Sequence, residues 1–414
     1  MSVCQSRSHL RRQLMLHRQT LLPRNFTISC VSVTNNRRVE VLELIENQID
    51  NERAILIANM LQRNISIFSL DLSRNCIGME GISALSDVLD ASYSVTCLYL
   101  SENSLTNRDV APLIKSLQSN FFLTTLDLSY NKITFENGQD LTAFLTNNET
   151  LITLDLRWCL ICDKGGLALA KGLKRNVSLK VLDVSWNGLG ERGLKNLALA
   201  LAYNNCLKAI NLANNNLTPK TTVHLARALK RNKSLEVLIL DNNTIRDDNT
   251  RPFIQLCLGH SSLMLLSLQG VHLGKKMSFY IQEMQYIASE ETHLTKIVLL
   301  NDCNDMHVVN ETLVRSFLQL LSDFIRQNGH SLEASFKSID KSRDGYLGLE
   351  STILCLEKTG FHIPLKSMKD LIKKIARENL EKIPYCIFFD DTIKGILKAN
   401  KQRLKRFEAV AKYL

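Results

Sequence analysis

The chain has 414 residues, of which 45% are hydrophobic and 22% are charged, and this is the composition of an ordinary globular protein with ample material for a core. No apolar run approaches the roughly 20 residues that a bilayer-spanning helix needs, and the N-terminus has no uninterrupted apolar segment of the secretory type. Eleven scattered cysteines without an export signal predict reduced thiols in an intracellular protein.

The net charge of +10 belongs to the two ends of the chain. Residues 1–39 contain seven arginines and no acidic residue, and residues 364–414 contain 13 Lys and Arg against six Asp and Glu. The charge is therefore weak support for a body that binds nucleic acid. We predict that residues 1–38 form a disordered basic arm. Their composition also fits a mitochondrial presequence. We expect a cytoplasmic protein, and nuclear and mitochondrial locations stay open.

From residue 39 onward the chain repeats itself every 28 residues. One column of the repeat holds asparagine or cysteine, at Asn47, Asn75, Asn103, Asn131, Cys159, Asn187, Asn215 and Asn243. Apolar residues stay in phase with this column, and leucines follow it ten and fourteen residues later, as at Leu113 and Leu117. The first part of each unit, LxxLxLxxN, alternates as a strand does, and the second part has the period of a helix.

One strand and one helix in 28 residues, repeated about nine to ten times, is the leucine-rich-repeat pattern. The 28-residue step over residues 39–305 resembles the ribonuclease-inhibitor-like subfamily. That resemblance implies an α/β horseshoe, with parallel strands on the concave side and helices on the convex side. Stacked units share one core because a single unit cannot bury its own apolar face. LTKIVLLND (294–302) is the expected last strand.

The repeat gives a structural explanation for two motifs that otherwise suggest function, the CxxC sequence and the N-x-S/T sequences. The asparagine column can satisfy backbone groups in the turn that leaves each strand, and cysteine substitutes there. Cys159 and Cys162, which spell CxxC, are therefore interpreted as structural rather than as a redox or zinc site. Several of the eight N-x-S/T sequences fall at another repeated position, at Asn64, Asn148, Asn176 and Asn232. Repetition explains them better than glycosylation does.

Three rows of side chains are expected on the concave face, because the leucines of each strand point inward. The first row carries Tyr99 and an acidic stripe that includes Asp127, Asp155 and Asp183. The second row is mostly serine and is interrupted by Arg157. The third row holds Tyr130, Trp158 and Trp186. Adjacent strands lie about 4.8 Å apart, so these rings should stand side by side at the rim.

Both a structural and a functional interpretation of these rows stay open. Acids are common in the first row across the subfamily, which favours a role in keeping the sheet face soluble. The aromatic trio either stacks between neighbouring turns or anchors a partner, since clustered aromatics on a concave surface are typical of recognition sites. In the second case we expect a protein partner with basic and apolar surface.

Residues 306–414 have helical patterning and resemble an EF-hand pair. The first loop has Asp340, Ser342, Asp344 and Tyr346 at positions 1, 3, 5 and 7, but position 12 is Ser351 where a bidentate glutamate is required. Glu350 lies one place early, and the second loop, ARENLEKIPYCI (376–387), has lost nearly every ligand. We expect a degenerate pair with no functional calcium site and a basic tail.

Repeats followed by a degenerate EF-hand pair resemble the group called leucine-rich repeat-containing protein 74. We predict a monomeric, non-enzymatic scaffold that holds a protein partner on the concave face, without cofactor, nucleic acid or membrane. Two alternatives stay open. One is a small-GTPase regulator of the Ran GTPase-activating-protein type, with Arg74 or Arg157 as a catalytic finger, although those proteins end in an acidic tail. The other is a calcium-responsive adaptor.

Overall fold

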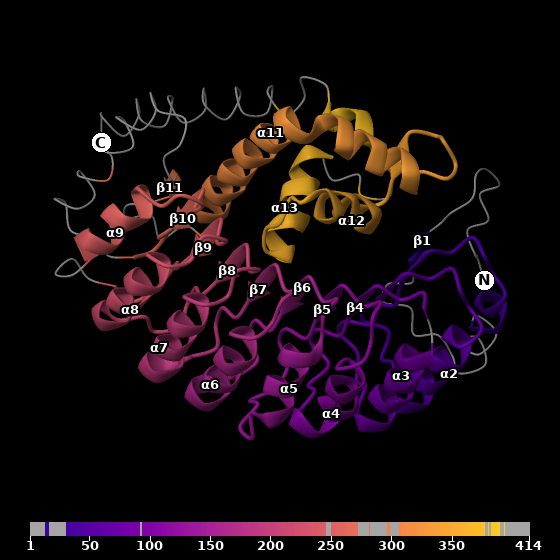
Figure 1. The fold of residues 1–414 in the computed structure, drawn as a ribbon. Coiled ribbons are helices and arrows are strands. Elements are labelled where there is room, and N and C mark those ends of the chain that lie inside the picture. The colour runs from indigo at the N-terminus through magenta and orange to yellow at the C-terminus, as the bar shows by residue number, and fades with distance from the viewer. Residues whose placement is uncertain are drawn as a thin grey trace. The chain divides into compact units, whose positions relative to one another are not determined.

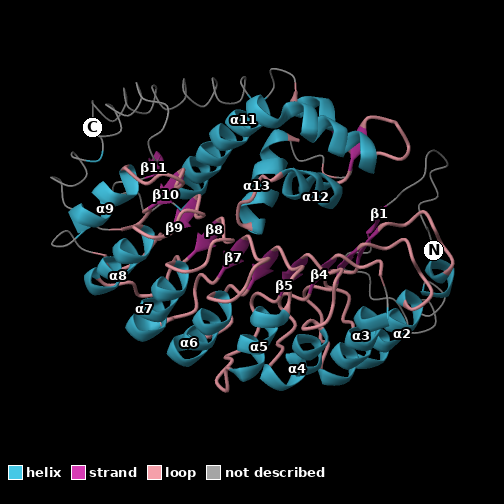
Figure 2. Ribbon diagram, in the orientation of Figure 1, coloured by secondary structure: helices cyan, strands magenta, loops and turns pink. Residues whose placement is uncertain are grey.

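The computed structural model describes residues 13–15, 30–91, 93–245, 250–271, 281, 296–298, 306–376, 380, 382–389 and 393. The chain divides into two compact units, residues 1–179 and 180–414. In each unit short parallel strands lie next to one another in sequence order, and helices cover one face of them (Figures 1 and 2). The opposite face is called the strand face below. This is the leucine-rich-repeat fold that the sequence predicts.

The first unit alternates strands and helices. Its strands are β1 (Gln13–Met15), β2 (Val41–Glu43), β3 (Ser69–Asp71), β4 (Cys97–Tyr99), β5 (Thr125–Asp127) and β6 (Thr153–Asp155). Its labelled helices are α2 (Asn51–Leu61), α3 (Met79–Ala91), α4 (Asn107–Ser116), α5 (Gln139–Asn147) and α6 (Cys162–Leu173). The strands pair in register at the 28-residue step, so that Leu98, Leu126 and Leu154 are aligned and almost completely buried.

The second unit continues the pattern and then changes to helices. Its parallel strands are β7 (Val181–Asp183), β8 (Ala209–Asn211), β9 (Val237–Ile239), β10 (Leu265–Ser267) and β11 (Lys296–Val298), with helices α7 (Gly190–Leu201), α8 (Pro219–Leu229) and α9 (Thr250–Leu258). β11 pairs with β10, which confirms the predicted last strand. The C-terminal elements are α11 (Met306–Ile339), β12 (Tyr346–Leu347), α12 (Leu349–Thr359), α13 (Leu365–Ile375), β13 (Ile383–Pro384) and the short helix η2 (Tyr385–Phe388).

The asparagine column satisfies the backbone as predicted. The Asn131 amide donates to the carbonyl oxygens of Leu100, Leu128 and Ser129, and its Oδ1 accepts from the N–H groups of Asn103 and Leu105. Asn75, Asn103, Asn215 and Asn243 make equivalent bonds. Each buried amide therefore joins two repeats, because it makes hydrogen bonds to the strand exit of its own repeat and to that of the repeat before.

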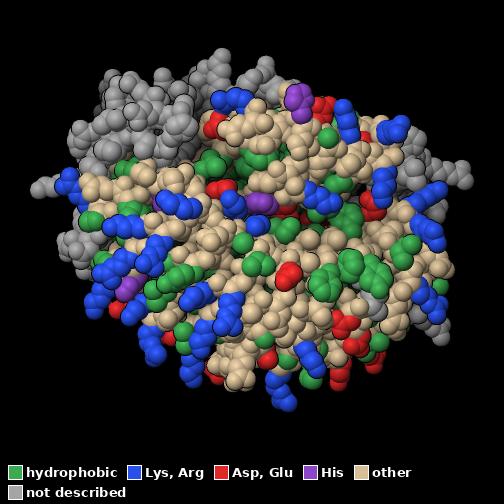
Figure 3. All heavy atoms as spheres, viewed as in Figure 1, with side chains coloured by type: hydrophobic (Ala, Val, Ile, Leu, Met, Phe, Trp, Pro, Cys, Tyr) green, Lys and Arg blue, Asp and Glu red, His purple; other side chains and the backbone are tan. Residues whose placement is uncertain are grey.

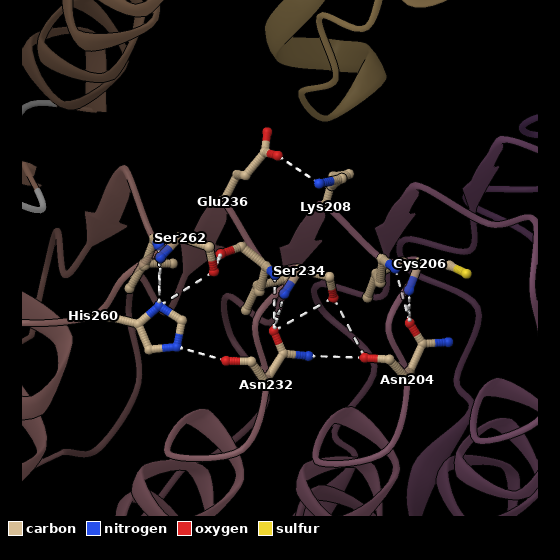
Figure 4. A network of polar contacts seen from close by, with 11 residues as sticks. Asn204, Cys206, Lys208, Asn232, Ser234, Glu236, His260 and Ser262 are labelled. Carbon is tan, nitrogen blue, oxygen red and sulfur yellow. Dashed lines mark hydrogen bonds and ion pairs between the residues drawn. The ribbon is translucent and has the colours of Figure 1, made fainter.

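A second ladder lies where each helix returns to the next strand (Figure 4). The Asn232 amide donates to the carbonyl oxygens of Leu201 and Asn204, and its Oδ1 accepts from the N–H groups of Ser234 and Leu235. The same geometry recurs at Asn64, Asn148 and Asn176, all of which are at most 5% exposed. These N-x-S/T asparagines are inaccessible in the fold, as repetition implied.

Part of the predicted N-terminal arm is folded, which corrects the expectation of disorder for those residues. Gln13–Met15 forms β1 and pairs in parallel with β2, and residues 30–34 are helical. Asn36 starts the second ladder, because its Oδ1 accepts from the N–H groups of Arg38 and Val39. An added strand and rung protect the otherwise unpaired edge of β2, as the end of a repeat array requires. Residues 1–12 and 16–29 of the arm, and residues 394–414 of the predicted basic tail, lie outside the described residues.

The C-terminal region contacts the repeats within the second unit, where α11 packs against β11. Burial, together with the nearby charges of Lys180 and Lys208, lowers the pKa of His362 to about 4. Lys180 and Lys208 precede β7 and β8, and His362 lies in the loop between α12 and α13. That loop therefore lies near the strands of its own unit. Among the described helices, none is long and apolar enough to cross a membrane.

Candidate functional site

The residue that precedes the asparagine column has a left-handed backbone in each of the nine repeats from Glu46 to Gly270. Its φ lies between +52° and +65° in the whole row, at Glu46, Arg74, Glu102, Tyr130, Trp158, Trp186, Asn214, Asn242 and Gly270. This conformation costs an L-residue roughly 1–2 kcal/mol, and glycine and asparagine adopt it most readily. The sharp turn directs each side chain of the row away from the strand that it follows. The aromatic trio therefore occupies a turn position and not a core position.

The three rings are displayed at the surface. Tyr130, Trp158 and Trp186 are 42%, 39% and 42% exposed. In the first unit the Tyr130 and Trp158 rings stack, with centroids 6.1 Å apart and planes 14° from parallel. Trp186 holds the equivalent position in the first repeat of the second unit. We call these three residues the strand-exit aromatics. The stack of Tyr130 on Trp158 is the arrangement that the structural interpretation expects, while the exposure of the three rings leaves part of each ring accessible, so their role as partner anchors stays a prediction.

Arg157 packs against this stack. Its guanidinium lies 5.6 Å from the centroid of the Tyr130 ring, and Nη2 is 2.9 Å from Oδ2 of Asp155. Only 12% of the Arg157 side chain is exposed. Cation–π contact and the ion pair hold the guanidinium in place. A catalytic finger must reach into a partner's active site, so this geometry does not favour that role for Arg157. Arg74 is more exposed, at 52%, and pairs with Glu102 at 3.1 Å.

The acidic row is buried, which corrects its predicted role as a contact stripe. Asp127, Asp155 and Asp183 are 8%, 1% and 3% exposed. Each carboxylate accepts a hydrogen bond from the backbone N–H two residues later, at 2.9–3.0 Å. Such local turns are a common use of Asp after a strand. The carboxylates therefore shape the strand exits, and they can influence a partner mainly through their field.

Tyr99 is also buried, at 1% exposure, where an exposed ring was expected. The strand register places Tyr99 directly between Asp71 and Asp127. Neighbouring strands are only about 4.8 Å apart, so flanking side chains enclose a large ring in the middle of a strand. A ring at the strand exit escapes this enclosure because its backbone turns. Tyr99 is therefore a packing residue of the strand face and not a contact residue.

The predicted calcium loop is folded, and its carboxylates accept hydrogen bonds from groups of the loop itself. The Asp340 carboxylate accepts from the Ser342 hydroxyl and from the N–H groups of Arg343 and Gly345, at 2.8–2.9 Å. The Asp344 carboxylate accepts from the Tyr346 N–H at 3.1 Å. Glu350 is 6% exposed at its side chain and pairs with Lys369 at 3.3 Å. Ser351 is largely buried. Position 12 is thus a buried serine, and the neighbouring carboxylate of Glu350 is paired with a lysine.

The cysteines give no sign of redox or metal chemistry in the residues that the structure describes. Cys159 and Cys162 are free thiols. The Cys159 Sγ donates to the Leu128 carbonyl at 3.1 Å, which is the bond that asparagine makes in the other repeats, and burial raises the pKa of this thiol. No group of three potential metal ligands occurs within the described ranges. The structural interpretation of CxxC therefore holds for Cys159.

Sequence reasoning missed the left-handed row, although a signal was present. The column that holds the aromatics also holds Asn214, Asn242 and Gly270, the residue types that favour positive φ. A Cβ on Gly270 would lie 2.0 Å from the Asn242 Oδ1. Composition along the column would have indicated a turn and hence an exposed side chain.

Comparison with known proteins agrees with the repeat. The model of the family described as "Leucine Rich repeat" matches residues 63–86, 119–136, 147–170 and 175–198. No curated protein matches the chain. Among solved structures, the leucine-rich repeat-containing protein LegL7 from Legionella pneumophila is 21% identical with a TM-score of 0.46, covering 69% of this chain and 90% of its own. Leiomodin-1 Actin-Binding Site 2 is 18% identical with a TM-score of 0.32, covering 37% of this chain and 91% of its own. The matched repeats and the ladder of strand–helix units show that the chain has a leucine-rich-repeat fold.

Proposed function

We propose that the protein is a non-enzymatic scaffold that binds a protein partner through the strand-exit aromatics Tyr130 and Trp158 of its first unit. Leucine-rich-repeat proteins generally act in protein–protein interaction. The observation that supports this site is the exposed stack of Tyr130 and Trp158, with an ordered guanidinium beside it. Aromatic and arginine side chains contribute most of the binding energy at typical interfaces. A rigid, partly exposed stack binds at low entropic cost because its rings are already placed.

The proposed partner presents apolar groups together with lysine or arginine side chains. Apolar groups can pack on the exposed ring faces, and cations are attracted to the electron-rich face of tryptophan. The acidic row supports the same choice of charge through its field, although its carboxylates are buried. We further propose that the protein works as a monomer. We also propose that it has no functional calcium site, since Glu350 pairs with Lys369. Cytoplasmic location is supported by the nine described cysteines, all of them free thiols.

Affinity capture with three versions of the full chain tests this proposal. Trp158→Asn removes the ring and keeps a residue type that the chain itself uses at this position, at Asn214 and Asn242. Glu102→Asn places asparagine at the same turn two repeats earlier, where it removes the ion pair with Arg74 but no aromatic ring, and serves as the control. Truncated anchors typically cost about 2 kcal/mol or more, which is roughly a thirtyfold loss of affinity. We expect Trp158→Asn alone to lose bound proteins. Equal capture by all three versions would refute the site.

A further inference from the structure

A groove of about 480 Å³ lies on the helix side of the first unit, between α5 and α6. Its floor includes Ala143, Leu167 and Ala168, and the Thr142 and Thr146 side chains line it as well. The Thr146 Oγ1 is buried and has no hydrogen-bond partner among the described residues. This surface is made by helices, so it is separate from the strand-exit aromatics.

Three cations border the groove. Lys164 and Lys171 lie on α6 and Arg175 lies just beyond its end, seven and four residues apart, which places them along one side of the helix. All three are exposed. Glu136 is the single acidic residue of the lining. It lies in the preceding repeat, at the position equivalent to Lys164. The border therefore carries a net charge of +2. Figure 3 shows Lys and Arg side chains over α6 and acidic side chains over α3 of the same unit.

The chain contains an internal comparison that explains why the groove is open. In the second unit, α8 and the turn after it carry the same three cations at the same repeat positions, Lys220, Arg227 and Arg231. There Leu199 of α7 and Tyr203 of the turn after it hold the facing positions, and the Arg231 guanidinium lies 6.0 Å from the Tyr203 ring centroid. At the two equivalent places α5 has only Ala143 and Asn147.

The backbone of α5 adds to the opening. This helix has nine residues, against twelve in α6 and in α7. It begins after Gly138, whose φ is +64° and whose added Cβ would lie 2.8 Å from the Ala168 Cβ. Gly138 therefore allows α5 to start in close contact with α6. Small side chains then leave the space beside Lys171 and Arg175 unfilled.

We propose that this groove binds an acidic peptide segment of a partner protein. Seven residues of helix span about 10 Å, so Lys164 and Lys171 match two carboxylates about three extended residues apart. An apolar side chain between those carboxylates would cover Ala143, Leu167 and Ala168. Nucleic acid fits less well, because a backbone-binding surface needs a longer basic stripe without an acid in it.

Fluorescence anisotropy on the full chain tests the proposal with a labelled peptide of glutamates around a central leucine. The control probes are the same peptide with glutamines in place of glutamates and a labelled oligothymidylate. We expect the glutamate peptide to bind, with an affinity that falls as salt is added. Preference for the glutamine peptide or for the oligothymidylate would overturn the assignment.

Three variants locate the binding. Lys171→Glu should weaken binding of the glutamate peptide at least tenfold. Arg227→Glu makes the same charge change at the equivalent position on α8 and should leave the affinity within about twofold of wild type, since only long-range charge differs. The double variant Ala143→Leu with Asn147→Tyr copies the residues of α7 and fills the groove without changing charge, and it should also abolish binding. Equal losses in the α6 and α8 charge variants would show nonspecific attraction and contradict the groove.

Discussion

At the scale of single residues, repetition uses one backbone conformation for very different side chains. The strand-exit position is left-handed whether it holds Glu46, Trp158 or Asn242. The fold requires only that the residue tolerate this turn, so the side chain is free to serve another purpose. Large aromatics gain no backbone advantage over asparagine there. Their recurrence at Tyr130, Trp158 and Trp186 therefore agrees with the proposed role in binding a partner.

The ladder that ends in His260 gives a residue-scale prediction. His260 Nε2 lies 2.9 and 3.0 Å from the carbonyl oxygens of Leu229 and Asn232, and Nδ1 accepts from the N–H groups of Ser262 and Leu263. These are the bonds that asparagine makes in the other rungs. His260→Asn should therefore change the free energy of unfolding by less than about 1 kcal/mol. His260→Ala leaves buried groups unpaired and should cost about 3 kcal/mol or more.

Urea denaturation of the two variants and the wild type measures this difference. Both changes shorten the side chain, so packing loss is common to them. If His260→Asn were as destabilising as His260→Ala, the hydrogen-bonding explanation of the ladder would be wrong.

At the scale of elements, the sequence predicted the strands and helices of the repeat well because leucine columns report burial directly. The charged and aromatic positions were harder. Asp155 and Trp158 are three residues apart, yet one is buried and the other exposed, because the chain turns between them. A pattern of alternation cannot show where a strand ends and a left-handed turn begins. The groove beside α5 was also invisible, since it depends on the size of two side chains relative to those of another repeat.

The loop between α11 and α12 gives an element-scale prediction about calcium. The antiparallel pairing of Leu347 with Ile383 is the arrangement expected of an EF-hand pair, but position 12 lacks a carboxylate. Calorimetry on the full chain should detect no calcium binding in the micromolar range. Ser351→Glu should raise the affinity, because it supplies the missing bidentate ligand. A micromolar dissociation constant for the wild type would show that the loop is a working site.

At the scale of the whole molecule, the C-terminal helices contribute a pH dependence to the second unit. The pKa of His362 in the fold is about 4, below its ordinary value of 6.5. The unfolded chain therefore takes up a proton first as the pH falls, and stability decreases between about pH 6.5 and pH 4. The full difference corresponds to about 3 kcal/mol. Burial raises the pKa of Asp241 to about 6, which acts in the opposite direction as the pH falls.

Comparison of the wild type with His362→Gln at pH 7 and at pH 4.5 isolates the histidine, since Asp241 is common to both proteins. The wild type should lose more of its unfolding free energy than the variant does. An identical loss in the two proteins would mean that His362 is not buried near Lys180 and Lys208 in solution.

The proposed function requires that the strand-exit aromatics be displayed at the surface and not hold the fold together. The free energy of unfolding of Trp158→Asn, measured by urea denaturation of the full chain, tests this most directly. The ring is 39% exposed and stacks on Tyr130, so Trp158→Asn loses this contact, while asparagine relieves backbone strain of about 1–2 kcal/mol at the left-handed position and offsets most of the loss. We predict a change of less than about 1 kcal/mol in either direction. A loss of about 3–5 kcal/mol, as large-to-small substitutions in a core produce, would contradict the account.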